Sequence, residues 1–504
     1  MIEVKEVKPF IEPAASSVLN KVSNLLAEQG IKSYLVGGFV RDALLGRKTA
    51  DIDIAVAADA LEIALRIADA VGGRYVPLDE VNGVGRIVLA EGLPEFDFST
   101  IQDDIEQDLA RRDFTIDAMA IVLQDIANQP LDPSQLIDPF GGWNDLRRCV
   151  LRAVSETSFE SDAVRLLRAV RLAAELDFDI DKGTETLIRR YSDLIAGVAG
   201  ERVREEFLRI LALSQVGQLV SYLDELGLLT AMIPEMGQTK GVEQPKEHFW
   251  EVFDHSIQTV AAVEFLLRQG DWKYASEEIL AVVPWSAGLA QHFDREVSHG
   301  STRSSLLKLA ALLHDIAKPQ TKAIDENGRL RFLGHGPDGA AMAADILERL
   351  RFSAKEVKLV EIMVTHHLRP GQMSQNELPS RRAIYRYFRD TGEAGVDVLF
   401  LSLADHLATR GPNLNLANWQ EHAQMVDYVL TQHFQEESLV APPKLVDGHD
   451  LLSIFGMNPG PEVGELLEVI HEAQAAGELR TREEVLSYIK HYLSTLPPVV
   501  KGEG

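Results

Sequence analysis

The stretch that decides the fold is LVGGFVRD at residues 35–42, followed by DID at residues 51–53. An apolar strand ends at Gly37 and Gly38, and a short helix is expected directly after them. A glycine pair between a strand and a helix lets backbone N–H groups approach phosphate closely, and the helix N-terminus adds a favourable dipole. Arg41 lies one turn into the helix, where a guanidinium group can bind phosphate oxygens in a bidentate manner.

Asp51 and Asp53 flank one residue of the next predicted strand. Because side chains alternate along a strand, both carboxylates lie on the same face. Two carboxylates beside a phosphate cradle are suitable ligands for Mg²⁺. Two such ions can activate an attacking hydroxyl and stabilise a leaving pyrophosphate. Alone, a glycine pair is most often a turn and Asp-x-Asp a solvated strand end, but their order and spacing here favour a catalytic site.

The remaining periodicity predicts an α+β chain. In the first 150 residues it indicates helices and strands around a small mixed sheet, with helices at 18–29, 40–45 and 59–71 and strands at 33–36, 52–56, 86–90 and 95–100. From about Ser161 the apolar spacing becomes helical and stays so to about residue 435. A segment with two prolines at 436–445 then leads to a last helical piece. We expect domains at 1–150, 151–247, 248–412 and 413–504.

Composition excludes several classes of protein. The 504 residues carry a net charge of −27, which argues against a basic nucleic-acid coat or an anionic-membrane binder. A single cysteine, Cys149, excludes an intrachain disulfide framework, and no apolar run reaches the roughly 18 to 20 residues of a spanning helix. The first residues lack the layout of a signal peptide, so we expect a cytoplasmic protein. All 14 histidines lie from His248 onward, which indicates two chemically distinct halves.

A second motif, RRDFTIDAMA at 111–120, completes a resemblance to the class II tRNA nucleotidyltransferase and bacterial poly(A) polymerase family, within the DNA polymerase β-like superfamily. The resemblance implies a nucleotidyltransferase head in which Arg112 and Asp113 contact the nucleotide sugar. The family often has Asn where this chain has Asp117. Asp97, in FDFST at 96–100, matches a third strand carboxylate, although a structural role is nearly as plausible.

The next match is DAVRLLRAVR at 162–171, where the family typically shows Glu-Asp-Pro-Leu-Arg. Ser161 and Ala163 depart from that pattern. A spacing of three residues drifts around a helix, so the four charged residues form a slanted stripe, which on its own fits a solvated face with ion pairs. These residues, which we predict bind nucleotide, are Asp162, Arg165, Arg168 and Arg171.

The resemblance implies that Asp162 and Arg165 read the incoming base, and the chemistry agrees. Cytosine and adenine each present an amine donor next to a ring-nitrogen acceptor on the pairing edge. A carboxylate accepts from the amine, and a guanidinium donates to the ring nitrogen. Guanine and uracil reverse that order. One Asp–Arg pair therefore selects C and A over G and U without a nucleic-acid template.

An ordered set of histidines and aspartates in the second half resembles the HD phosphohydrolase domain. By that resemblance one divalent metal is held by His255, His314, Asp315 and Asp405, and a second by His335 with one or both of His366 and His367. Imidazole and carboxylate ligands suit Mn, Fe, Ni, Co or Zn. A phosphoesterase acting on terminal or cyclic phosphates of RNA or nucleotides is one hypothesis, and a vestigial scaffold is the other.

Two arginine clusters are candidate RNA surfaces in this acidic chain. Residues 147–171 hold six arginines and three acids, and Arg381, Arg382, Arg386 and Arg389 have no acid between them. Either cluster is equally consistent with a solvated face. Recognition of an RNA stem through backbone and 2′-OH contacts needs only a few such residues. Residues 446–494 resemble the C-terminal domain found behind the HD domain in these enzymes.

Together these patterns predict an enzyme that adds C and A from CTP and ATP to the tRNA 3′ end, with Mg²⁺ at Asp51 and Asp53. The 3′-hydroxyl attacks the α-phosphate, and pyrophosphate leaves. A poly(A) polymerase, or a partial enzyme adding only CC or only A, is the first alternative. A segment over 78–86, expected to be flexible, is a candidate determinant of that choice. The second alternative is an HD phosphohydrolase whose head only binds RNA.

Overall fold

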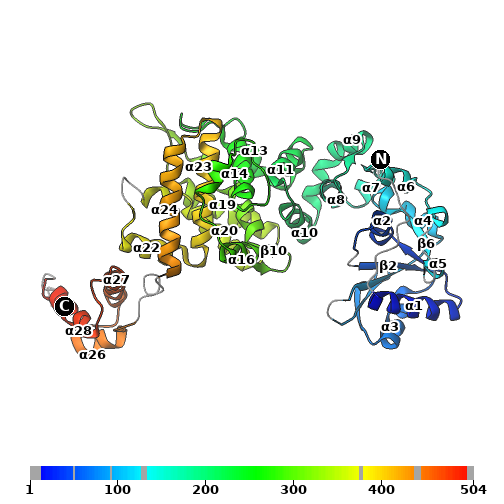
Figure 1. The fold of residues 1–504 in the computed structure, drawn as a ribbon, viewed down its shortest axis with the longest axis horizontal. Helices are drawn as coiled ribbons and strands as arrows, with labels where there is room; N and C mark the ends of the chain where they lie inside the picture. The colour runs from blue at the N-terminus through cyan, green and yellow to red at the C-terminus, as the bar shows by residue number, and fades with distance from the viewer. Residues whose placement is uncertain are drawn as a thin grey trace, which may run out of the picture. The chain divides into compact units, whose positions relative to one another are not determined.

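The computed structural model describes residues 13–48, 51–90, 93–126, 133–373, 378–435 and 444–495. The chain forms two compact units (Figure 1), one of residues 1–207 with 222–232 and the other of residues 208–221 with 233–504. No helix among the described residues is both long enough and apolar enough to cross a membrane.

The first unit begins with a head built around one sheet. Its elements are α1 (Pro13–Glu28), β1 (Ser33–Val36), α2 (Gly38–Leu45), β2 (Asp51–Val56), α3 (Ala60–Val71), β3 (Arg74–Asp79), β4 (Val84–Val88), β5 (Glu95–Thr100), α4 (Ile105–Ala110), the 3-10 turn η1 (Thr115–Asp117), β6 (Ala120–Val122), α5 (Leu123–Ile126), the 3-10 turn η2 (Pro133–Gln135) and α6 (Gly142–Arg147).

The head sheet has six strands in the order β3-β4-β5-β2-β1-β6. β2 and β5 run parallel, with Asp53 opposite Asp97, whereas β1 is antiparallel to β2. Alternate strand residues such as Ile54, Phe96 and Phe98 are fully buried, which leaves the intervening aspartates on the other face. The predicted small mixed sheet is therefore confirmed.

The edge of the sheet contains a strand that the sequence analysis did not predict. β3 pairs with β4 in an antiparallel hairpin that spans residues 78–86, and the flexibility expected of that segment stays a prediction. β3 was not predicted because Pro77 interrupts its pattern. Proline lacks a donor and is tolerated on an edge strand, which is the position β3 occupies.

The chain after the head is almost entirely helical, as predicted. The elements up to residue 232 are β7 (Val150–Leu151), α7 (Ser158–Ser161), α8 (Arg165–Leu176), β8 (Asp179–Ile180), α9 (Lys182–Tyr191), the 3-10 turn η3 (Ser192–Gly197), α10 (Gly200–Leu211), α11 (Val216–Glu225) and α12 (Leu228–Met232).

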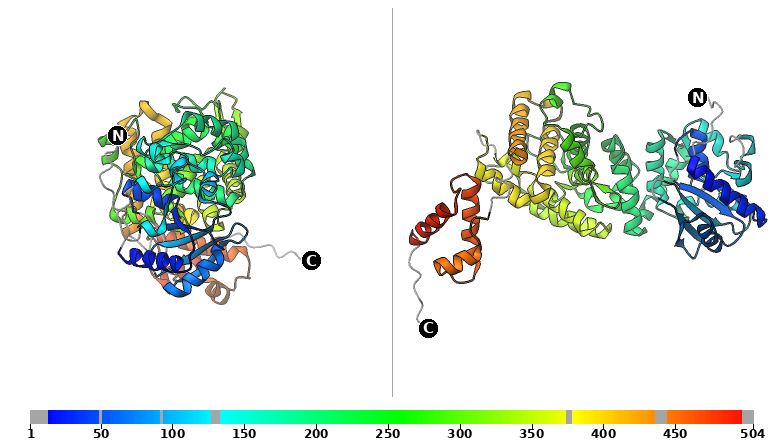
Figure 2. Two further views of the ribbon diagram at one scale, coloured as in Figure 1. Left: turned by 90° about the vertical axis from the view of Figure 1, so that its right-hand side faces the viewer. Right: turned by 60° about the horizontal axis from the view of Figure 1, so that its bottom comes forward.

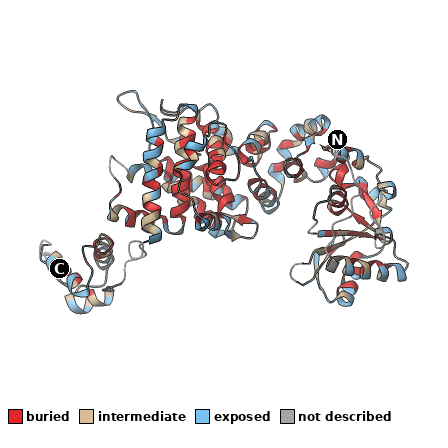
Figure 3. Cartoon of the chain, viewed as in Figure 1, coloured by how far each residue is buried: buried red, intermediate tan, exposed pale blue. Residues whose placement is uncertain are grey.

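The second unit contains a helical bundle in which α14, α17 and α23 pack on one another. Figure 3 shows these central helices as mostly buried. The elements are α13 (Pro234–Gln238), α14 (Val252–Leu266), α15 (Glu277–Ala281), α16 (Ala287–Asp294), β9 (Glu296–Ser298), β10 (Ser301–Thr302), α17 (Arg303–Leu313), α18 (Lys318–Thr321), β11 (Lys322–Ile324), β12 (Leu330–Phe332), α19 (His335–Arg349), α20 (Ala354–His366), α21 (Arg369–Met373), α22 (Arg381–Thr391), the 3-10 turns η4 (Gly392–Ala394) and η5 (Gly411–Asn413), α23 (Gly395–Arg410) and α24 (Leu416–Gln435).

The last helices, α26 (Gly448–Phe455), α27 (Pro461–Ala475) and α28 (Arg482–Thr495), form a small bundle with its own core (Figure 2). Most of the proline-containing link expected at 436–445 lies outside the described residues. α24 packs on α23, and the Trp419 indole donates to the Ile279 carbonyl at 3.0 Å. The expected boundary at 412/413 thus falls between two helices that pack together.

Candidate functional site

The head carries three carboxylates on one face of its sheet. Asp51 and Asp53 lie on β2, and the parallel register places Asp97 of β5 beside Asp53. Burial raises the pKa of Asp53 to about 6; Arg112 opposes the rise, whereas Asp97 and Asp51 add to it. Carboxylate repulsion of this kind is relieved by a bound cation, and the oxygen donor set suits Mg²⁺.

Asp97 has a partner that the sequence analysis did not identify. Arg86 of β4 stands opposite it in register, and its Nε and Nη2 each donate to the Asp97 carboxylate at 2.7 Å. Arg86 also pairs with Glu95. Asp97 is therefore neutralised on one side, which sets it apart from Asp51 and Asp53.

Gly37 forms the closest backbone approach in this region. Its φ is +67°, and an added Cβ would lie 2.6 Å from Arg112 Nη1 and 3.3 Å from Asp53 Oδ2. The positive φ favours glycine, and a side chain here would displace the end of the Arg112 side chain. The Arg112 guanidinium and the Asp53 carboxylate thus both lie close to the glycine turn, and Arg112 is a candidate contact for an anionic ligand.

Arg41 is more enclosed than the sequence indicated. Its Nε and Nη2 donate to Asp42 at 2.9 and 3.0 Å, and its Nη1 donates to Asp117 at 2.8 Å. The guanidinium folds back over Gly38. Two of the five guanidinium N–H groups remain for a phosphate. The predicted binding of phosphate by Arg41 stays a prediction. The side chain of Arg112 nearby is more exposed than that of Arg41.

Residues 111–113 connect the carboxylates to α8. Arg168 Nη1 donates to Asp113 Oδ2 at 3.1 Å, and Arg165 Nη2 donates to the Arg111 carbonyl at 2.8 Å. Arg112 acts electrostatically on Asp53, and the residues on either side of it in the chain contact α8. The 111–113 segment therefore lies near both the head carboxylates and the first turn of α8.

Asp162 is bound by an arginine that the sequence analysis did not identify. Arg202 of α10 donates to both oxygens of Asp162, at 2.9 and 2.8 Å, whereas Arg165 Nε lies 3.9 Å away. Burial alone would raise the pKa of Asp162, but the positive charges of Arg202 and Arg165 outweigh burial and lower the pKa below its usual value. Asp162 is thus held ionised, as an acceptor of hydrogen bonds.

The other arginines of the predicted stripe converge on Glu206 of α10. Arg168 Nε donates to it at 3.2 Å and Arg171 Nε at 2.5 Å, while Arg171 Nη1 donates to Glu175 at 2.6 Å. Arg171 is buried. Its guanidinium group holds α8 against α10. The predicted contact of Arg171 with a nucleotide stays a prediction.

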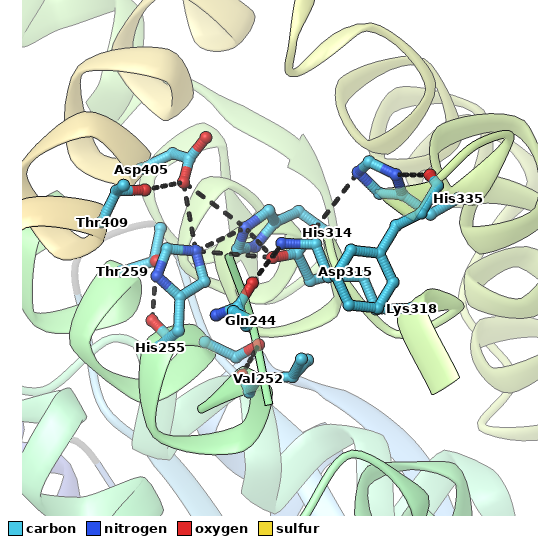
Figure 4. A network of polar contacts seen from close by, with 12 residues as sticks. Gln244, Val252, His255, Thr259, His314, Asp315, Lys318, His335, Asp405 and Thr409 are labelled. Atoms are coloured by element: carbon cyan, nitrogen blue, oxygen red, sulfur yellow. Dashed lines mark hydrogen bonds and ion pairs between the residues drawn. The ribbon is translucent and has the colours of Figure 1, made fainter. Parts of the chain in front are cut away.

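The second unit brings the expected histidines and aspartates together in its core (Figure 4). His255 Nε2, from α14, lies 3.1 Å from Asp405 Oδ1, 3.2 Å from His314 Nε2 and 3.4 Å from Asp315 Oδ2. His255, His314 and Asp315 offer one ligand atom each within a distance suited to one ion. The long connection between His255 and His314 does not separate these ligands.

Asp315 also belongs to a second group, with His335 and His367. The Nε2 atoms of His335 and His367 lie 3.2 Å apart. Their Nδ1 atoms lie 2.6 and 2.7 Å from the carbonyls of Phe332 and Val364, to which they donate. Both Nε2 lone pairs therefore face each other, an arrangement that a shared cation stabilises.

His366 does not join either metal group, whereas its neighbour His367 does. His366 is the last residue of α20 and is only half-buried. The sequence analysis left open whether one or both histidines are ligands, and the geometry favours His367 alone, because successive helical residues point about 100° apart.

Lys318 and a cavity complete this second site. Lys318 Nζ lies 2.6 Å from Asp315 Oδ2 and donates to Gln244 Oε1 at 2.5 Å. A cavity of about 660 Å³ adjoins Asp405 and the candidate ligand His367. Its wall also includes Arg410, His406 and His422. The space is large enough for a ligand bigger than a phosphate ion.

The fold and the two sites define a polymerase-like nucleotidyltransferase head joined to an HD domain. The family described as "Poly A polymerase head domain" matches residues 33–102 and 93–152, and "HD domain" matches 252–410. "Probable RNA and SrmB-binding site of polymerase A" matches 177–239, and tRNA nucleotidyltransferase domain 2 matches 407–489.

Relatives extend the match over more than nine tenths of the chain. An A-adding tRNA nucleotidyltransferase of Deinococcus radiodurans is 34% identical over 92% of this chain and 96% of its own. A CC-adding tRNA nucleotidyltransferase of Thermus thermophilus is 32% identical over 91% of this chain and 93% of its own. The chain belongs to the tRNA nucleotidyltransferase family, with an HD domain, and is a nucleotidyltransferase.

Solved structures share the fold. A CCA-adding enzyme in complex with CTP superposes with a TM-score of 0.63 at 22% identity, covering 96% of this chain and 97% of that one. A Thermotoga maritima CCA-adding enzyme complexed with tRNA has a TM-score of 0.60 at 22% identity, covering 96% of both chains. The likeness confirms the predicted architecture.

Proposed function

We propose that the protein adds C, A or both to the 3′ end of tRNA, using CTP and ATP. The observation that carries the proposal is that residues 111–113 lie beside the head carboxylates and contact Arg165 and Arg168 of α8, the helix that begins just after Asp162. This arrangement supports one site in which Asp51 and Asp53 serve phosphoryl transfer and Asp162 serves base selection. The A-adding and CC-adding relatives support the same chemistry.

In this mechanism the head residues orient the triphosphate and the 3′-hydroxyl for in-line attack on the α-phosphate. Gly37 and Gly38 let the backbone approach the phosphates, and Arg112, assisted by Arg41, neutralises their charge. Mg²⁺ bound at Asp51 and Asp53 supplies Lewis-acid stabilisation of the attacking and leaving oxygens. Asp113, fixed by Arg168, faces the sugar.

Base selection belongs to Asp162 and Arg165 in this proposal. Asp162 accepts from the exocyclic amine of C or A, and Arg165 donates to the adjacent ring nitrogen. Arg202 occupies two of the roughly four acceptor sites of the carboxylate, so a base amine still finds a free lone pair.

The test is nucleotide addition to tRNA ending before the CCA sequence, and to tRNA ending in CC, with CTP alone, ATP alone or both. Addition of C only, A only or CCA in order identifies the partial or complete activity, and long homopolymeric A tails would identify a poly(A) polymerase. Asp53→Asn should lower kcat by about 10³-fold, since the carboxylate contributes several kcal/mol to transition-state stabilisation.

A matched control is Asp69→Asn, on the exposed face of α3, which should leave kcat unchanged. Full activity of Asp53→Asn would contradict the mechanism. Failure of the wild-type protein to extend any tRNA would contradict the proposed function.

We further propose that the HD site is a metal-dependent phosphohydrolase acting on terminal or cyclic phosphates of RNA or nucleotides. Two ligand groups that share Asp315, beside a cavity, support this activity. Imidazole and carboxylate donors suit Mn, Fe, Ni, Co or Zn. Assays of phosphoester hydrolysis across these metals test it, and inactivity with every metal would indicate a scaffold.

A further inference from the structure

α22 has two different faces. One face packs into the HD bundle, where the Tyr387 hydroxyl donates to the Gly395 carbonyl at 2.6 Å. The other face carries a row of arginines at spacings of four and three residues, which places them on one side of the helix. We refer to these residues as the arginine row: Arg382, Arg386 and Arg389.

The arginine row is covered by glutamates of α27 and of the turn after it. Arg386 donates twice to Glu472, each time at 2.6 Å. Arg389 donates to Glu468 at 2.6 Å, and Arg382 donates to Glu478 at 2.6 Å. In each of these contacts α22 supplies the cation and the C-terminal bundle the anion, so the contact is electrostatically complementary.

The arginine side of these ion pairs is open to solvent, whereas the Glu472 side chain is 14% exposed. The side chains of Arg382, Arg386 and Arg389 are 44%, 51% and 37% exposed. Each exposed pair contributes only about 0–1 kcal/mol and is screened by salt. A competing anion therefore replaces them at little cost.

The C-terminal bundle does not depend on this contact for its fold. Its core consists of residues of the bundle alone, namely Val446, Leu451, Leu466, Ile470, Ala473, Leu479, Val485 and Ile489. Release of the glutamates from α22 leaves that core intact.

We propose that the arginine row is a binding surface for the RNA backbone, and that the glutamates occupy it until tRNA phosphates replace them. Arginine binds phosphate with the same bidentate geometry as carboxylate. Three carboxylates are displaced together only by a ligand with an array of phosphates, which gives selectivity for RNA over mononucleotides. The proposal rests on tRNA being the substrate.

The test compares three triple variants of the full-length protein in tRNA binding, measured by fluorescence anisotropy over a range of salt. Glu468→Gln, Glu472→Gln and Glu478→Gln together uncover the row. Glu462→Gln, Glu465→Gln and Glu483→Gln remove the same charge from exposed sites of the same bundle. Arg382→Gln, Arg386→Gln and Arg389→Gln remove the row itself.

The uncovered triple should bind tRNA about tenfold more tightly than the charge-matched control, because the competing ion pairs are lost. The arginine triple should bind more weakly than wild type, with a log–log salt slope shallower by about 2 to 3. Thermal unfolding and nucleotide addition at saturating tRNA confirm that each variant is folded.

Equal affinity of the two glutamate triples, or wild-type affinity of the arginine triple, would show that the ion pairs are only a structural contact. That result overturns this inference and leaves the proposed function standing. If wild-type protein binds no tRNA, the proposed function fails and this inference fails with it.

Discussion

Asp162 accepts two hydrogen bonds from Arg202, 40 residues away in sequence, whereas Arg165, three residues after it, forms only a longer ion pair at 3.9 Å. The local spacing placed Asp162 near Arg165, but Asp162 has an extended backbone before α8 and is not part of the predicted helical stripe, because α8 begins only at Arg165. Arg202 and Arg86 could not be assigned in this way. Each meets its aspartate through tertiary packing. Arg202 lies outside the motifs that the sequence analysis named, and Arg86 ends the 78–86 segment, to which no ion pair was assigned.

The base-selection hypothesis is tested most directly at Asp162. Asp162→Ala should reduce the preference for CTP and ATP over UTP and GTP by roughly 10- to 100-fold, since a hydrogen bond to a charged group contributes about 1.5–3 kcal/mol. The measurement is kcat/KM for all four nucleotides. Asp162→Asn is the control, because its amide retains an acceptor oxygen and should keep part of the preference. Undiminished selectivity in Asp162→Ala would refute a protein template.

Among the secondary-structure elements, α20 shows what sequence alone could not decide. The pattern identified a histidine pair at its end, but two adjacent histidines point in different directions, and only the packed bundle determines which faces Asp315. The strands of the head were easier to predict, because the glycine turns and apolar runs that bound β1 and β5 are local signals. β3 was missed since its proline is tolerated only through its edge position.

The end of α20 provides a matched pair of variants for metal binding. His367→Ala should remove about one equivalent of bound divalent metal, because His367 completes one of the two ligand groups. His366→Ala should leave metal content unchanged. Elemental analysis of both proteins after identical metal loading measures the effect. Equal loss in both variants would contradict the assignment of His367 as the ligand.

α6 packs on η1 and thereby supports the 111–117 segment. This packing allows a prediction about stability. A Cβ on Gly142 would lie 2.0 Å from the Thr115 carbonyl oxygen. Gly142→Ala should therefore lower the free energy of unfolding by about 1–3 kcal/mol through overpacking. Gly197→Ala has open space at its Cβ and should be nearly neutral. Chemical denaturation of both variants measures the difference. Equal free energies of unfolding would show that η1 shifts to accommodate the methyl group without loss of stability.

For the whole molecule, the structure explains part of the net charge of −27 by the positions of individual carboxylates. Some carboxylates are candidate metal ligands, as Asp51 and Asp315 are, and others neutralise arginines that the sequence presented as free. Both predicted basic clusters contain such pairs, including Arg171 with Glu206 and Arg386 with Glu472. Composition could not reveal this, because it counts charges without their partners.

The two candidate sites lie in different compact units, so their activities should be separable. Asp51→Ala should abolish nucleotide addition and keep phosphoester hydrolysis, while His314→Ala should abolish hydrolysis and keep addition within about twofold. Both activities are measured on each variant and on the double variant, with the metal of the HD site held constant. Loss of addition in His314→Ala, with the head still folded by its binding of CTP, would show that the HD domain takes part in the nucleotidyltransferase reaction. Retained addition in Asp51→Ala would instead refute the role of the head carboxylates.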